Sequence, residues 1–146
     1  MNSIAEPKLA PPGAGLPKPE LVIARLIFAV QSRKGNRDTF NAQFTHERDA
    51  IRRLLDSCAP ASAATRVLIK RLPGLEDSSR FWSVWMVLDH LRIVNQGVVR
   101  TIESLSNEIP RSGQASTAAV KPNPDVDSSV RGRCRGGRVD QVSPVV

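Results

Sequence analysis

The chain has 146 residues, the length of one ordinary domain, with 21 Lys and Arg against 14 Asp and Glu and a net charge of +7. The basic excess is diffuse, because residues 1–110 carry fifteen basic and eleven acidic side chains and residues 111–146 carry six and three. Such spreading predicts solubility and excludes a specific nucleic-acid face, which needs clustered charge.

The sequence gives no sign of a cysteine-based site, a membrane span or a secretory signal. Cys58 and Cys134 form no CxxC or Cys/His pattern, so we predict neither a zinc site nor a disulfide framework. The longest apolar run, 21–30, contains Arg25 and is far shorter than the roughly 20 residues that cross a bilayer. The N-terminus has no basic start followed by an apolar stretch. We therefore expect a cytoplasmic chain without a membrane partner.

Residues 1–19 hold five of the eleven prolines and show no apolar period, so they predict an extended, weakly packed arm. Residues 20–34 are apolar on nearly every side, which predicts a buried helix. The pair Gly35-Asn36 predicts a break. A second helix follows, capped by Asp38, with an apolar face ending at Cys58-Ala59-Pro60.

After a connector, residues 67–77 predict a loop with one extended piece, because a short apolar run precedes a Pro-Gly turn. Asp77 or Ser78 is then the expected N-cap of a long helix. From Ser79 the apolar positions alternate steps of three and four as far as Ile109, a seam interrupted by one polar residue, Asn95. Pro110 is expected to end this helix, which predicts a central position among other helices.

Residues 111–146 are rich in Ser, Gly, Pro and Arg and predict a disordered basic tail. Within it, 131–138 resembles a short Arg-Gly box, which favours salt-sensitive binding of phosphates, but it occurs once and lacks aromatic residues. An unstructured basic end is the favoured interpretation. Trp82 and Trp85, next to Phe81 and Met86, predict core positions and not a base-stacking platform.

His90 is the candidate site residue. It borders the predicted interior of the long helix, and small residues lie seven positions away on either side, at Ser83 and Gly97. One reading is a metal ligand, and the other is a histidine satisfied by one hydrogen bond at a helix contact. The second histidine, His46, falls on the solvent side of its helix, among acidic and basic residues that we interpret as a solvated face. No HxxxH or ExxH pair completes a metal site.

The stretch from Arg71 to Asn95, with Trp82-Ser83 followed by Leu88-Asp-His90-Leu91, resembles the DinB-like superfamily of putative metalloenzymes. The resemblance covers about residues 20–125. It implies an all-α, up-down four-helix bundle that binds a divalent metal, nickel or zinc, through one histidine and a later HxxxH-type pair. His90 matches the first ligand. Relatives include thiol-dependent transferases and isomerases.

The resemblance implies further helices and the histidine pair beyond Val120, where this chain instead reads as basic tail, so we expect a truncated or divergent member. The expected organisation is a Pro-rich arm (1–19), a partial DinB-like domain (20–110) and a tail (111–146). We expect a metal-dependent enzyme fragment with an incomplete site at His90 that is not catalytic as this chain. The alternative is a small helical protein that associates with itself, as a homodimer, or with a partner.

Overall fold

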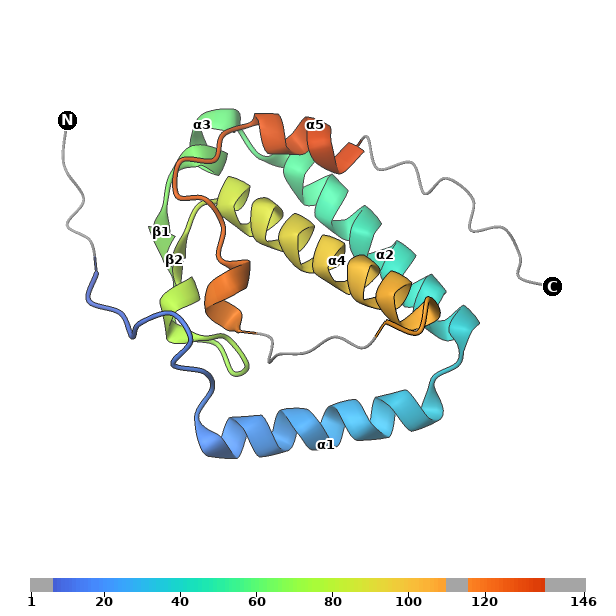
Figure 1. The fold of residues 1–146 in the computed structure, drawn as a ribbon. Helices are drawn as coiled ribbons and strands as arrows, with labels where there is room; N and C mark the ends of the chain where they lie inside the picture. The colour runs from blue at the N-terminus through green and yellow to red at the C-terminus, as the bar shows by residue number, and fades with distance from the viewer. Residues whose placement is uncertain (1–6, 110–115, 136–146) are drawn as a thin grey trace. The chain divides into compact units, whose positions relative to one another are not determined.

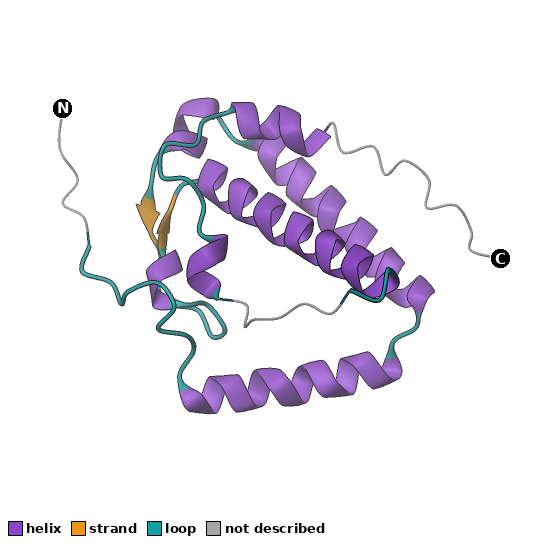
Figure 2. Ribbon diagram, in the orientation of Figure 1, coloured by secondary structure: helices purple, strands orange, loops and turns teal. Residues whose placement is uncertain are grey.

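The computed structural model describes residues 7–109 and 116–135, without the side chains of 133–135, and it is mainly α-helical (Figures 1 and 2). The helices are α1 (Lys18–Lys34), α2 (Arg37–Ser57), α3 (Pro60–Ala64), α4 (Val84–Ser106) and α5 (Ser129–Arg135), with 3-10 turns η1 (Asp77–Ser79) and η2 (Thr117–Val120). Strands β1 (Val67–Leu68) and β2 (Phe81–Trp82) pair in a two-stranded sheet, which confirms the extended piece expected in 67–77.

The chain divides into two compact units. One comprises Met1–Ala63 and Leu68–Phe81, and the other comprises Ala64–Val67 and Trp82–Val146. Across the described residues, every helix is too short or too polar to traverse a lipid bilayer.

Helix α1 occupies the expected residues, but the prediction that it is buried is wrong. It has no buried residue, and the Phe28 side chain is 74% exposed. The sequence showed a segment apolar on most sides, which is typical of a buried helix. Burial also requires a neighbouring surface, and the pattern of one segment does not reveal whether the chain supplies it.

The bend between α1 and α2 lies where Gly35-Asn36 predicted it. The N–H of Gly35 donates to the Gln31 carbonyl, and a Cβ at Gly35 would overlap the ring of Phe40. Asn36, and not Asp38, is the N-cap of α2, because its side-chain oxygen accepts from both the N–H and the hydroxyl of Thr39 at 2.9 Å. Like α1, α2 has no buried residue.

Helix α2 ends at Ser57, as the following Cys58-Ala59-Pro60 predicted. The connector expected after it contains the short helix α3, which begins at Pro60. Proline is well tolerated at the start of a helix, because its missing N–H has no intrahelical partner there.

Helix α4 starts later than the seam suggested. The expected N-cap, Asp77 or Ser78, instead belongs to η1, and the residues after it form β2. The true N-cap is Ser83, whose hydroxyl accepts the N–H of Met86 at 3.2 Å. The three-residue spacing of the apolar residues Phe81 and Val84 fits a helix and a strand-to-helix junction equally well. The spacing of apolar residues therefore could not locate the first turn of α4.

Helix α4 also ends earlier than expected, at Ser106. The N–H of Ile109 donates to the Ser104 carbonyl and that of Glu108 to the Leu105 carbonyl, which is the Schellman arrangement. Glu108 adopts φ 56°, the left-handed conformation that this motif requires and that favours glycine. The helix is thus closed by its own backbone before Pro110 is reached.

In the second unit, α4 packs against η2 and α5 (Figure 1). Trp85, Met86 and Leu88 are buried on the first turns of α4, and Val130 of α5 is fully buried. Burying each such side chain contributes about 1.5–3 kcal/mol. The sequence predicted no regular structure after residue 110, but residues 116–135 supply this cover. Residues 110–115 and 136–146 of the predicted tail, including the end of the Arg-Gly box, lie outside the described residues.

We predict that Glu108→Gly raises the free energy of unfolding by about 1 kcal/mol, because glycine adopts the left-handed conformation without the penalty of a Cβ. The measurement is denaturant unfolding followed by circular dichroism. Glu103→Gly is the matched control: it removes the same charge from within α4 and should lower stability by about 1 kcal/mol. Equal effects of the two substitutions would contradict the capping role of Glu108.

Candidate functional site

His90 lies on the second turn of α4, half-buried, against the segment that follows α4 in sequence. Its Nδ1 is 2.6 Å from the carbonyl oxygen of Val120, and its ring lies 5.1 Å from the ring of Trp82 at an interplanar angle of 54°. The ammonium of Lys121 lies 5.8 Å from the Trp82 ring centroid. His90 therefore joins α4, β2 and η2 in one polar and aromatic cluster.

Asp89, the residue before His90, holds the same segment. It is 3% exposed, and its Oδ1 accepts from Arg92 Nε at 3.0 Å and Nη2 at 2.8 Å. Its Oδ2 accepts the backbone N–H of Asn123 at 3.1 Å. A nearly buried carboxylate with three charge-assisted hydrogen bonds is a structural anchor, because burial without partners is costly.

The hydrogen bond to Val120 sets what His90 can do chemically. A carbonyl oxygen only accepts, so Nδ1 carries the proton and the neutral ring keeps its lone pair on Nε2. That tautomer is the one with which a histidine binds a metal, but it also fits a histidine that serves only packing. The structure thus places His90 at the expected helix contact with one hydrogen bond, and its metal role stays a prediction.

The described residues do not assemble a ligand set around His90. Among the side chains that the structure describes, 7–109 and 116–132, no three His, Cys, Asp or Glu are placed to hold a metal ion. The neighbouring carboxylate of Asp89 is engaged by Arg92 and Asn123. A metal that needs three protein ligands does not fit the residues described.

His46 lies on α2 with 74% of its side chain exposed, as predicted. The acidic residues near it belong to the solvated face expected there, where Asp49 lies 3.5 Å from Arg48 and 3.4 Å from Arg52. Exposed pairs of this kind contribute about 0–1 kcal/mol. The core position predicted for both tryptophans is confirmed for Trp85, which is buried. Trp82 is instead half-buried, beside His90.

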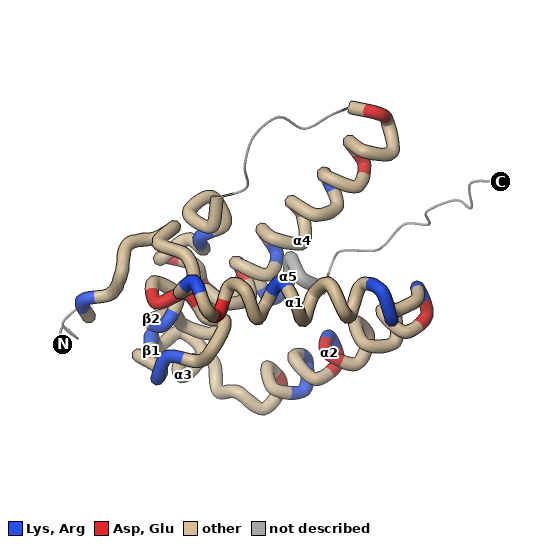
Figure 3. The backbone as a smooth tube through the Cα atoms, turned by 90° about the horizontal axis from the view of Figure 1, so that it is seen from below, with Lys and Arg blue, Asp and Glu red and all other residues tan. Residues whose placement is uncertain are grey.

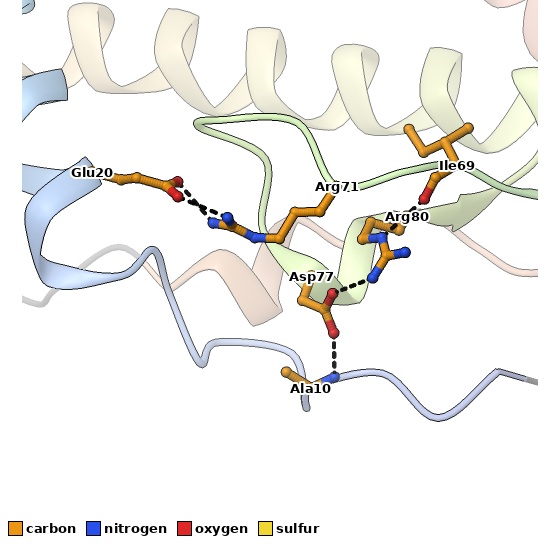
Figure 4. Close-up of polar contacts among 6 residues, drawn as sticks. All are labelled: Ala10, Glu20, Ile69, Arg71, Asp77 and Arg80. Atoms are coloured by element: carbon orange, nitrogen blue, oxygen red, sulfur yellow. Dashed lines mark hydrogen bonds and ion pairs between the residues drawn. The ribbon is translucent and has the colours of Figure 1, made fainter.

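The first unit has a second polar cluster, built on three carboxylates, and Figure 4 shows the contacts of two of them, Glu20 and Asp77. Glu20 of α1 accepts from both terminal nitrogens of Arg71 at 2.7 Å and from the Gly74 N–H at 3.1 Å. Asp77 accepts the Ala10 N–H at 2.8 Å and pairs with Arg80 at 2.7 Å. Arg80 also donates to the Ile69 carbonyl, across the ends of the two strands.

The third carboxylate, Glu76, accepts the N–H groups of Gly13 and Gly15 at 2.9 and 3.0 Å. Both glycines have positive φ, 85° and 75°, a conformation that residues with a Cβ rarely adopt. Residues 10–15 are thereby pinned to the turn at 76–77. The missing apolar period predicted weak packing of this arm, but carboxylates that accept backbone N–H groups hold residues 10–15 through hydrogen bonds.

These contacts perturb ionisation. The hydrogen bonds from Arg71, followed by that from Gly74, lower the pKa of the Glu20 carboxyl, and Glu20 raises the pKa of Arg71. The N–H of Ala10, followed by Arg80, lowers the pKa of Asp77. Each carboxylate accepts hydrogen bonds in its charged form, which favours that form. The arrangement is that of a structural clamp, with no nucleophile among its members.

The most extensive feature of the described surface is apolar. Five apolar residues are buried, while 22 large apolar residues are exposed, and these lie mostly on α1, α2 and the second half of α4. Lys, Arg, Asp and Glu residues occur along several helices and are not gathered on one of them, in keeping with the diffuse charge of the sequence (Figure 3).

Sequence reasoning missed the groups that hold both clusters. Val120 and Asn123 contribute backbone atoms, which no side-chain pattern identifies, and no sequence pattern assigned a site role to Glu20 or Glu76. One signal was available: the Val-Lys-Pro-Asn-Pro run at 120–124 breaks the polar tail, and its Pro122 is buried.

No family model, curated protein or solved structure matches the chain.

We predict that the clamp loses its contribution to stability in acid. Because the folded-state pKa values of Glu20 and Asp77 are lowered, their contribution is complete above the ordinary carboxyl range, about pH 4, and is lost as the pH falls through the folded-state values. The measurement is the unfolding free energy as a function of pH. Glu20→Gln should flatten this acid limb.

The matched control for this prediction is Glu47→Gln, an exposed carboxylate whose near partner is His46 at 3.7 Å. It should leave the acid limb as in the wild-type protein. An acid limb that is unchanged by Glu20→Gln would mean that the Glu20–Arg71 contact does not contribute to folding stability in solution.

Proposed function

We propose that this chain is a helical association protein, which binds another helical surface through apolar side chains on its helices. One observation carries the proposal: α1 and α2 have no buried residue, although α1 is apolar on nearly every side and α2 has an apolar face. A helix in water is stabilised mainly by packing of its apolar face, because its own hydrogen bonds leave it marginal at this length. These helices therefore require a partner surface.

The size of the effect favours association over a solvated monomer. Full burial of one large apolar side chain contributes about 1.5–3 kcal/mol, and α1 alone exposes seven: Leu21, Val22, Ile23, Leu26, Ile27, Phe28 and Val30. Even partial burial of a few of them is comparable to the whole stability of a small domain, about 5–15 kcal/mol. Self-association is the simplest route, because it needs no second component.

The expected result is a molar mass that rises from monomer to dimer with protein concentration, measured by sedimentation equilibrium on the full chain. Apolar association should persist or strengthen in high salt, whereas binding through basic residues to a nucleic acid weakens steeply as salt is added. A monomer at every concentration, together with no binding of an apolar dye, would contradict the proposal.

A second candidate rests on His90. We propose that His90 is one ligand of an incomplete metal site of the DinB-like kind, in the four-helix bundle that the resemblance implies. The supporting observation is the hydrogen bond from Nδ1 to the Val120 carbonyl, which leaves Nε2 as the metal-binding nitrogen. Because one histidine holds a metal only weakly, this candidate includes no catalysis by the chain alone.

For this candidate we predict uptake of Ni²⁺ or Zn²⁺ that is lost in His90→Ala and retained in His46→Ala. The two substitutions remove the same group, one from the cluster on α4 and one from the exposed face of α2. Calorimetric titration with each metal measures the uptake. No uptake by the wild-type protein, or equal uptake by both variants, would exclude His90 as the ligand.

A further inference from the structure

The second half of α4 carries an apolar seam that its own unit leaves open. Along the helix the seam positions are Leu91, Asn95, Val98, Ile102 and Leu105. Leu91 is 36% exposed, and the last three are 52%, 58% and 63% exposed. Steps of four and three separate them, which is the heptad spacing of a coiled coil.

The packing within the unit lies on another side of the helix. The buried residues Trp85, Met86, Leu88 and Asp89 lie on the first turns of α4, and Asp89 accepts the N–H of Asn123 from the segment that packs against the helix. From Leu91 onward the seam is free of that cover. A Cβ added at Gly97, beside the seam, would meet nothing within 4 Å. The second half of α4 therefore projects an uncovered apolar stripe.

The residues of the seam fit one occupant, a second copy of the same helix. In heptad terms Asn95 and Ile102 occupy a positions, and Leu91, Val98 and Leu105 occupy d positions. A β-branched residue at a with leucine at d favours two parallel strands, and a single asparagine at a fixes register and a two-stranded state. In a parallel pair Asn95 meets Asn95 of the other copy, and the two amides hydrogen-bond to each other.

The other orientation and other partners fit less well. In an antiparallel pair a positions face d positions, so Asn95 would oppose an apolar residue and lose its hydrogen-bond partner. A wholly apolar partner helix would have the same defect. The exposed amide in the middle of an apolar seam is thus complementary to itself.

The charges beside the seam permit close approach of two copies. The flanking positions that meet in a parallel pair are Val94 with Val99, and Thr101 with Ser106, so no like charges face each other. The nearest flanking cation, Arg92, is paired with Asp89 of its own chain at 2.8 Å. The helix keeps Arg100 and Glu103 on positions outside the seam.

We infer that the protein forms a parallel homodimer through α4, in register at Asn95. This inference rests on the proposed function and names its partner. A covered Leu, Ile or Val side chain removes on the order of 100 Å² from water. The seam and its two valine flanks then approach, without reaching, the roughly 800 Å² per partner of a standard interface. The dimer should therefore dissociate on dilution.

Disulfide trapping tests the register. The full chain, with Cys58→Ser and Cys134→Ser to remove its own thiols, keeps Asn95 and is given Ile102→Cys, and in a second protein Glu103→Cys. At an a position of a parallel pair the two sulfurs lie within bonding reach, whereas the next position points outward. Mild oxidation should convert the Ile102→Cys protein to a covalent dimer and leave the Glu103→Cys protein monomeric on a non-reducing gel.

A second pair of variants measures the seam without a new thiol. Ile102→Glu places two like charges in one layer and should raise the dimer dissociation constant by roughly a hundredfold or more. Arg100→Glu introduces the same residue outside the seam and should leave that constant within about threefold. Because Ile102 is exposed in the single chain, its replacement should not unfold the protein.

The outcomes separate this inference from the function on which it rests. A wild-type protein that stays monomeric at all concentrations and binds no apolar dye overturns both, whereas a monomer that binds the dye overturns the dimer alone. A wild-type dimer in which Ile102→Cys and Glu103→Cys crosslink equally, or in which Ile102→Glu has no effect, overturns the α4 seam alone. That result would assign the interface to α1 or α2, or the seam to another segment of the same chain.

Discussion

Apolar burial in the second unit depends on one contact, between the first turns of α4 and the segment that follows the helix. Trp85, Met86 and Leu88 are buried there, with Val130 contributed by α5. The contact brings together residues that are far apart in sequence. It also partly buries backbone polar groups of the following segment, and these groups need hydrogen-bond partners. Asp89 and His90 provide them by binding the backbone at Asn123 and Val120. A small apolar core and two polar anchors thus form one structural element.

The first unit is organised differently, since carboxylates and not apolar side chains hold its loops. Glu20, Glu76 and Asp77 bind backbone N–H groups or arginines, and together they fix the N-terminal arm to the turn before β2. Such hydrogen bonds and ion pairs fix the position of a loop, but they remove little apolar surface from water. The apolar faces of α1 and α2 therefore remain exposed, and this is the physical origin of the proposed association.

The sequence predicted the features that local chemistry determines. Gly35-Asn36 correctly located the bend after α1, Cys58-Ala59-Pro60 the end of α2, and the three-four spacing the existence of α4. Prediction from the sequence failed where burial depends on residues far away in the chain. The composition of α1 is that of a buried helix, but composition does not show whether another segment packs against it. The predicted start of α4 was wrong because Ser83 and the earlier Asp77 are equally good N-cap residues by type.

The same distinction applies to the site. The position of His90 at the edge of the interior followed from helical periodicity, while its partner, a backbone carbonyl in a region expected to be tail, carried no signal. If association covers the apolar helix faces of this chain, hydrogen exchange of the wild-type protein should depend on its concentration. We expect amides of α1 or of the second half of α4 to gain protection at high concentration, while those around Trp85 do not change. Identical exchange at both concentrations would mean that association does not cover these faces.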